Sequence, residues 1–217
     1  MVSKPTRVLL FGLVLVMLGF SGTVIYSSIF LHFFRIPSVS MSNTIIRGDH
    51  LVVKTRAFGD ITRGDLIVFR YPDEPSTYYL ARVIGLPNET LAVRGKLIYV
   101  NDKLLEEQRV TVRPDEPGQM EPMEELSAEG SGDYRVFYFA EYEEDEYPYG
   151  GPEPFLIPDN QYFVMGDNRD NSRDSRYRGP VPRSLVFGKP TMIYWSEHED
   201  ASGAVQTRWD RLFTKVK

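Results

Sequence analysis

The sequence predicts a mainly β protein, an antiparallel β-sheet domain preceded by one N-terminal transmembrane helix. Residues 8–34 contain no Asp, Glu, Lys or Arg, and about 20 apolar residues are enough for a helix to cross a bilayer. After this run, short stretches rich in β-branched and aromatic residues alternate with Gly, Pro, Asn and Asp, as in strands joined by turns. With 217 residues, 42% of them hydrophobic, the chain can form one folded domain beside the anchor.

The apolar N-terminal run sets the expected topology. A cleavable leader has an apolar core of only about 7 to 15 residues, which makes this run too long for that interpretation. Lys4 and Arg7 precede it, and positive residues favour the cytoplasmic side of a membrane. We therefore expect a cytoplasmic tail over residues 1–7, a single-pass helix over 8–34 and an extracytoplasmic domain over 35–217, with the lipid bilayer as a partner.

Strands are expected in the apolar runs that follow, with glycine turns at Arg47-Gly48-Asp49 and Arg63-Gly64-Asp65. The ranges are 50–55, 65–71, 78–86, 90–100, 109–112, 134–140, 161–165 and 184–195, with a last strand or short helix over 209–217. Between about 101 and 158 the composition changes to Glu, Pro and Gly. We interpret that region as an acidic insertion into the sheet domain, and its densest part, residues 141–146, as a solvated loop.

Composition excludes several functional classes. The chain carries 25 Lys and Arg against 30 Asp and Glu, a net charge of -5, which disfavours nucleic acid as a partner. It has no cysteine, so a disulfide framework and a thiolate nucleophile are excluded. The three histidines have no metal-ligand spacing. We expect neither a metal nor a cofactor, and we expect a monomer.

A serine-containing segment, residues 37–45 with the sequence PSVSMSNTI, follows the apolar run closely; we call it the serine segment. A serine hydroxyl becomes a useful nucleophile only where a base removes its proton and donors stabilise the oxyanion that follows. Without other signals, a polar loop leaving the membrane is the simpler interpretation of Ser38, Ser40 and Ser42.

Three later stretches change that interpretation. They read RGDLIVFRYP over 63–72, YLARVIGLP over 79–87 and GDNRDNSRDSR over 166–176, the last of which we call the polar loop. Together with the serine segment, and in the same order, they resemble the boxes of the bacterial type I signal peptidase, or leader peptidase, family. The resemblance extends over residues 37–179 and leaves the acidic insertion unmatched.

This resemblance implies a site and a reaction. Ser40 would be the nucleophile, and Ser38 with the backbone N–H of Ser40 would form the oxyanion hole. From the polar loop, Ser172 would hydrogen-bond the catalytic lysine, while Asp167, Asp174 and Arg176 would support the site. The family removes signal peptides from exported preproteins after small residues, typically Ala-x-Ala, so preprotein signal peptides are the expected partners.

The chain departs from the family pattern at the base. The catalytic lysine falls at position 81, which is alanine. That lysine must be neutral to act, so burial has to lower its pKa from about 10.4. Because an alanine methyl accepts no proton, we predict an inactive chain: a Lys to Ala replacement in an otherwise active enzyme, or else a naturally inactive homologue that binds signal peptides. Asn43 also replaces a proline of the family.

Other possibilities remain open at this stage. A base could come from elsewhere, although the remaining candidates match no box: His32, His50, His198, Lys54, Lys96, Lys103 and Lys189. A self-cleaving Ser/Lys protease of the LexA kind has a similar fold. The anchor and the match over 82–87 argue against that function.

Overall fold

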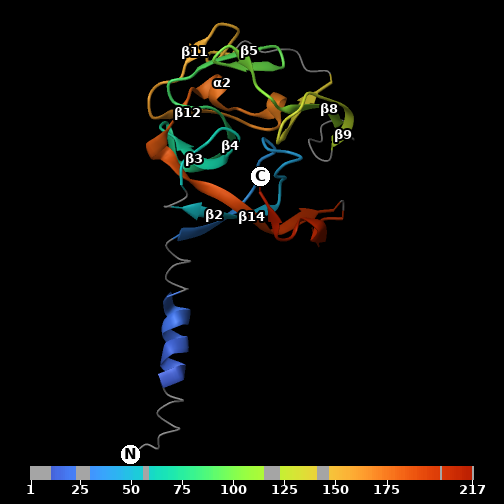
Figure 1. The fold of residues 1–217 in the computed structure, drawn as a ribbon. Helices are drawn as coiled ribbons and strands as arrows, with labels where there is room; N and C mark the ends of the chain where they lie inside the picture. Colours follow the sequence, from blue (N-terminus) through green and yellow to red (C-terminus); the bar gives the residue numbers. More distant parts are fainter. Residues whose placement is uncertain are drawn as a thin grey trace, which may run out of the picture.

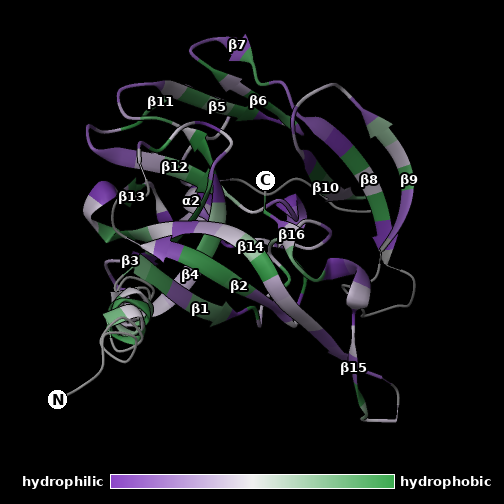
Figure 2. Ribbon diagram, turned by 60° about the horizontal axis from the view of Figure 1, so that its bottom comes forward, coloured by the Kyte–Doolittle hydropathy of each residue, from purple (hydrophilic) through white to green (hydrophobic). Residues whose placement is uncertain are grey.

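The structure is a computed structural model that describes residues 11–22, 30–55, 59–114, 123–140, 147–200 and 202–216. Its largest sheet has nine strands, in the order β1-β2-β14-β3-β4-β12-β13, with β15 and β16 also paired to β14. Every pairing in this sheet is antiparallel, and β1, β2 and β14 lie side by side in Figure 2. Its strands are β1 Leu31–Arg35, β2 Asp49–Thr55, β3 Leu66–Tyr71, β4 Glu74–Gly85, β12 Gln161–Met165, β13 Val181–Pro182, β14 Val186–Glu199, β15 Val205–Thr207 and β16 Thr214–Lys215.

Two smaller sheets complete the domain (Figure 1). One has the order β11-β5-β6-β7 and the other β10-β8-β9, in which β10 and β8 run parallel. The strands are β5 Thr90–Arg94, β6 Leu97–Val100, β7 Lys103–Leu104, β8 Gln108–Pro114, β9 Met123–Glu129, β10 Arg135–Phe139 and β11 Phe155–Leu156. The helical turns are η1 Arg169–Asn171, α2 Ser175–Arg178, η2 Arg183–Leu185 and η3 Trp209–Arg211. The expected mainly antiparallel β fold is thus confirmed.

Strand β4 is buried on both of its faces at its C-terminal end. Successive side chains of a strand point to opposite faces. Ala81 and Val83 pack in one core cluster, while Leu80 and Ile84 pack in two others. This explains why β4 reads as a continuous apolar run around Arg82 rather than as an alternation of polar and apolar residues.

The prediction that the membrane helix extends to residue 34 is wrong. Residues 31–34 belong to β1, which pairs with β2 from Leu31↔Lys54 to Arg35↔His50. The aromatic side chains there alternate, so that Phe34 packs on Phe187 while Phe33 contacts Tyr194. A short aromatic run is as compatible with a strand as with a helix end.

The rest of the predicted anchor is described only in part. Residues 11–22 are helical, with exposed apolar side chains, and Figure 1 shows this helix standing apart from the sheets. Residues 8–10 and 23–29 lie outside the described part of the chain. Within the described ranges, no helix has both the length and the apolar character needed to cross a membrane.

One predicted strand, over residues 90–100, is in fact a hairpin. Gly95 has a φ of 60°, and Arg94 pairs with Leu97 across a two-residue turn that starts at Gly95. The turns that were predicted at Gly48 and Gly64 are present, and each of these glycines has a φ of 88°. The predicted loop over 141–146 lies outside the described residues.

Removing a ring from the core should cost much of the stability. Phe163 is fully buried in the cluster that joins β12 to the β5–β6 sheet. We expect Phe163→Ala to lower the free energy of unfolding by about 3–5 kcal/mol, because it deletes a large apolar contact and leaves a cavity. Urea denaturation of both proteins measures the difference.

Leu126→Ala is the matched control, since Leu126 on β9 is 41% exposed. Its unfolding free energy should stay within about 0.5 kcal/mol of the parent. Equal losses for the two variants would contradict the assigned core.

Candidate active site

Ser38 and Ser40 lie within hydrogen-bond distance of each other. The Ser38 hydroxyl donates to Ser40 Oγ at 3.0 Å, and the Ser40 backbone N–H donates to Ser38 Oγ at 3.1 Å. Among the residues that the structure describes, Ser40 Oγ has no other hydrogen-bond partner. The two donors expected to form an oxyanion hole are therefore adjacent, and each is engaged by the other serine.

The polar loop holds the serine segment through its backbone. Asn168 N–H donates to the Ser40 carbonyl at 3.0 Å, and Asn168 Nδ2 donates to the Val39 carbonyl at 3.1 Å. A third contact fixes the next residue, since the Asp167 N–H approaches Met41 Sδ at 3.4 Å. These three contacts hold the polar loop against the serine segment.

Gly166 is the point of closest approach. A Cβ atom at this position would lie 2.3 Å from Ser172 Oγ and 2.5 Å from the Ser40 carbonyl oxygen, distances that real Cβ atoms essentially never show. Only a residue without a side chain fits between them. Ser172 and the Ser40 carbonyl therefore both lie directly against Gly166.

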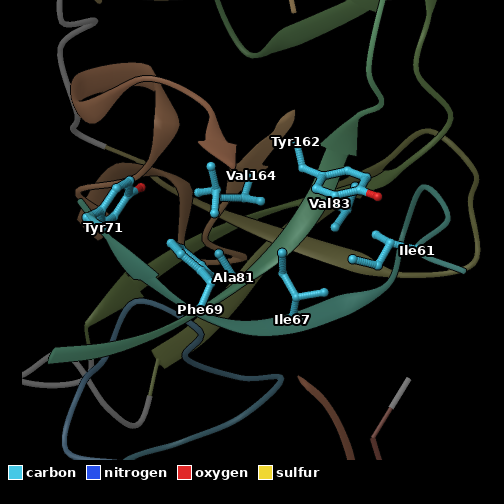
Figure 3. Close-up of a cluster of buried hydrophobic side chains, with 9 residues drawn as sticks. Ile61, Ile67, Phe69, Tyr71, Ala81, Val83, Tyr162 and Val164 are labelled. Atoms are coloured by element: carbon cyan, nitrogen blue, oxygen red, sulfur yellow. The ribbon is translucent and has the colours of Figure 1, made fainter. Parts of the chain in front are cut away.

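Ala81 is buried in an apolar cluster beside this point. It is 3% exposed and lies on β4 among Ile67, Phe69, Val83 and Val164 (Figure 3). We call the cluster that surrounds Ala81 the apolar pocket; its other members are Ile61, Tyr71, Tyr162 and Val181, with Tyr79, Leu86 and Val186 packed against it.

The strand register relates Ala81 to Gly166. Arg82 on β4 pairs with Met165, the last residue of β12. The ladder ends at this pair, and its extension by one residue would bring Ala81 opposite Gly166. Residues opposite each other in an antiparallel pair project their side chains from the same face. We therefore infer that the Ala81 methyl lies on the face of Gly166 that Ser172 and the Ser40 carbonyl border.

Arg82, the next residue, holds the polar loop from the other face of β4. Its guanidinium donates to both carboxylate oxygens of Asp167, at 2.8 and 2.6 Å, and the exposed fractions of the two side chains are 2% and 0%. Asp167 also accepts a hydrogen bond from the Thr44 hydroxyl at 2.7 Å. One carboxylate therefore ties β4 to the serine segment.

Asp174 and Arg176 form a second buried ion pair. The Arg176 guanidinium donates to both Asp174 oxygens at 2.9 Å, and Gly166 N–H donates to Asp174 Oδ2, also at 2.9 Å. Burial alone would lower the pKa of Arg176, but the Asp174 carboxylate outweighs it and the pKa is raised. This pair holds the backbone at the point of closest approach.

Sequence reasoning missed the partners of the polar loop that lie outside it. Arg169 pairs with Glu107, and Asp170 accepts a hydrogen bond from the Phe139 N–H at 2.7 Å. Both partners belong to the region interpreted as an insertion. Glu107 had no distinguishing signal, because it is one Glu among many in an acidic stretch.

Asn43 adopts a backbone conformation that the family's proline could not. Its φ is 69°, a left-handed value at which Asn is several-fold enriched, whereas proline is locked near −65°. A proline at position 43 would therefore be incompatible with this left-handed backbone conformation.

The alternative bases lie elsewhere. His32 contacts Thr55 and Phe187, His50 faces Glu197, and Lys189 binds Asp65. Lys96 donates to the Phe139 carbonyl, while the remaining candidates are on other strands: Lys54 on β2, Lys103 on β7 and His198 on β14. Within the described ranges, no group of three or more His, Cys, Asp or Glu could hold a metal.

Known proteins are similar to this chain in sequence. The family described as signal peptidase, peptidase S26, matches residues 6–195. Signal peptidase I of Pseudomonas aeruginosa is 34% identical over 188 residues, covering 75% of this chain and 64% of that protein. Signal peptidase I of Rickettsia typhi is 32% identical over 194 residues, covering 75% of this chain and 71% of that protein. The chain thus spans less than two thirds of the length of the Pseudomonas relative.

A crystal structure of a signal peptidase I from Enterococcus faecalis aligns with 61% of this chain and 98% of that chain, at 24% identity and a TM-score of 0.38. That likeness is too low to support a further conclusion.

A side chain at Gly166 should disrupt the site. We expect Gly166→Ala to lower the free energy of unfolding by about 1–3 kcal/mol, because its methyl would overlap Ser172 and the Ser40 carbonyl. Urea denaturation measures the loss. Gly151→Ala is the control, since its Cβ would meet its nearest neighbour, the Tyr147 carbonyl, at an ordinary 3.5 Å; similar losses in both variants would refute the close approach.

Asp170 should give the polar loop a measurable pH signature. Burial raises the pKa of Asp170 above its usual 3.8, and the Phe139 N–H and nearby cations offset this only in part. The stability that its protonated form contributes is present below pH 3.8 and is lost as pH rises through the folded-state pKa. Asp170→Asn keeps an acceptor and cannot ionise, so its stability relative to the parent should increase with pH across that window.

Urea titrations at several pH values measure this difference. Asp200→Asn is the control of opposite sign, because hydrogen bonds from Ser202 and neighbouring groups lower the pKa of Asp200 to about 2. Its stability relative to the parent should fall as pH rises from about 2 to 3.8. A constant or decreasing difference for Asp170→Asn would be inconsistent with a raised pKa.

Proposed function

The chain belongs to the signal peptidase, peptidase S26, family, and on this premise we propose that its site is that of a membrane-bound serine endopeptidase with the general base missing. The reaction is the removal of N-terminal signal peptides from exported preproteins. Ser40 is the nucleophile, and position 81 is the place of the base.

The observation that carries this proposal is the environment of Ala81. A lysine there would extend from the apolar pocket on the face where Ser172 and the Ser40 backbone meet. Desolvation in such a pocket lowers the pKa of an amine, so that the neutral form able to accept the Ser40 proton becomes populated. The pocket therefore has the property that a lysine base requires.

The serine pair supplies the remaining chemistry. In the free protein the Ser38 hydroxyl and the Ser40 N–H are engaged within the pair, at 3.0 and 3.1 Å. When the scissile carbonyl of a substrate enters the site, both donors would give up these hydrogen bonds and donate to the carbonyl oxygen instead. Both donors then stabilise the negative charge that develops on that oxygen during attack.

The missing base explains why this chain is expected to be inactive. The alanine methyl accepts no proton, and within the described residues the other histidines and lysines with assigned contacts are engaged elsewhere. Loss of one member of a nucleophile–base unit can reduce kcat by about a million-fold. The serine then remains protonated and unreactive.

We place the protein at the inner membrane, with the N-terminus in the cytoplasm and the β domain in the periplasm. The uncharged run at 8–30 and the exposed apolar side chains of helix 11–22 support this. An extended signal peptide would add to a sheet edge as a strand, with small residues before the cut. Residues 35–217 would form the peptidase domain, which acts as a monomer.

A second function deserves the same test. The serine pair, the buried Asp167 and the closely packed Gly166 are all in place without a base. A natural homologue that binds signal peptides without cutting them would look the same. A native alanine at position 81 would indicate a natural binding homologue, and a replaced lysine would indicate an inactivated peptidase. The activity of a variant with lysine restored tests whether the site can cleave.

Restoring the amine should restore cleavage. We expect Ala81→Lys to cleave a preprotein with an Ala-x-Ala site at least about 1,000-fold faster than the parent, since the residual rate without a base comes only from oxyanion stabilisation and binding. Single-turnover cleavage of a purified preprotein in detergent, with identification of the new N-terminus, measures it.

Ala81→Met is the matched control, because it fills the apolar pocket to a similar length without an amine. The double variant Ala81→Lys with Ser40→Ala should also be inactive. Absence of cleavage by a folded Ala81→Lys protein that still binds signal peptide would favour the binding homologue over the peptidase.

A further inference from the structure

Strand β10 is part of the region interpreted as an insertion, yet it contacts the polar loop directly. Phe137 N–H donates to the Asp167 carbonyl at 2.7 Å, and Phe137 forms a parallel bridge with Asn168. Two residues further along, Phe139 N–H donates to Asp170 at 2.7 Å. The polar loop is therefore supported by a strand that lies outside both the loop and the serine segment.

Glu107 makes the strongest contact from this region. Its carboxylate accepts from both terminal nitrogens of Arg169, at 2.8 and 2.6 Å. The two side chains are 1% and 0% exposed, and Arg169 also donates to the Tyr138 hydroxyl at 3.1 Å. A bidentate pair of this kind fixes distance and direction together.

The position of Arg169 connects this pair to the nucleophile. Arg169 directly follows Asn168, whose backbone and side-chain amides hold the Ser40 and Val39 carbonyls. Because the Arg169 guanidinium is buried, water cannot replace its carboxylate partner. Loss of the carboxylate would leave a buried, unpaired charge and so displace the side chain. Displacing Arg169 would move Asn168 and, with it, the Ser40 backbone.

We propose that Glu107 is a positioning residue for Ser40, acting through Arg169 and Asn168. Its catalytic consequence rests on the proposed peptidase function, while its effect on the loop does not. Glu107 touches neither Ser40 nor position 81, so its loss should change the rate of the chemical step rather than the binding of substrate.

The structural part is tested in the chain as it stands. In Glu107→Gln, the amide proton of Asn168, bonded to the Ser40 carbonyl at 3.0 Å, should exchange at least tenfold faster, as a local opening within a folded protein. Glu125→Gln is the matched control. Glu125 also binds an arginine, Arg135, with both oxygens, but it is 45% exposed. Unchanged exchange in Glu107→Gln, or equal acceleration in the control, would overturn the proposal.

The catalytic part is tested in the Ala81→Lys background. Glu107→Gln should lower kcat by about 10- to 100-fold with KM nearly unchanged, because small misplacements of reacting groups cost rate. In the double variant Glu107→Leu with Arg169→Met, both charges are gone and the thermal midpoint should recover, whereas kcat should stay low.

Recovery of kcat together with the thermal midpoint would show that Glu107 serves stability alone, and would overturn the proposal. An Ala81→Lys protein that cleaves nothing would count against the peptidase function instead, and the exchange measurement would still decide the positioning role.

Discussion

The buried ion pair between Arg82 and Asp167 is the contact on which the site depends. It joins β4 to the polar loop across 85 residues of sequence, and both side chains are almost without solvent exposure. Removing one partner of such a pair costs about 3–5 kcal/mol, because the other charge stays buried alone. Since neighbouring side chains on a strand point to opposite faces, fixing Arg82 on one face also fixes Ala81 on the other. The same Asp167 holds Thr44, so strand, loop and serine segment share one anchor.

The two faces of β4 therefore have separate tasks. On the Arg82 face, Met41 packs with Leu80 and the neighbouring core, which holds the serine segment in place. On the Ala81 face lies the apolar pocket, and Ser172 and the Ser40 carbonyl both lie against Gly166. An alanine suits that pocket, whereas a lysine would lose hydration there. Chemistry and stability thus favour different residues at position 81, a conflict typical of active sites.

The local patterns predicted most of the strands, because these depend on short-range periodicity, while the supporting roles of Asp174 and Arg176 came from the family resemblance. They failed for β1, where a short aromatic run carries no helical or strand period of its own, and at Gly95, where a turn interrupts an apolar stretch. The pairing of Arg169 with Glu107 could not be predicted, since it joins residues 62 apart in the sequence and no local pattern encodes such a contact. Residues that support the site but lie outside the family motifs, such as Glu107, can be identified only from the three-dimensional structure.

The central claim is that position 81 and Ser40 share one site although 41 residues separate them in the sequence. A high-resolution crystal structure of the Ala81→Lys protein tests it most directly, through the position of the new Nζ atom. The account predicts Nζ within about 3 Å of both Ser40 Oγ and Ser172 Oγ, with the alkyl chain inside the apolar pocket. An Nζ that lies in solvent or points toward another part of the sheet, with Ser40 bonded only to Ser38, would contradict it.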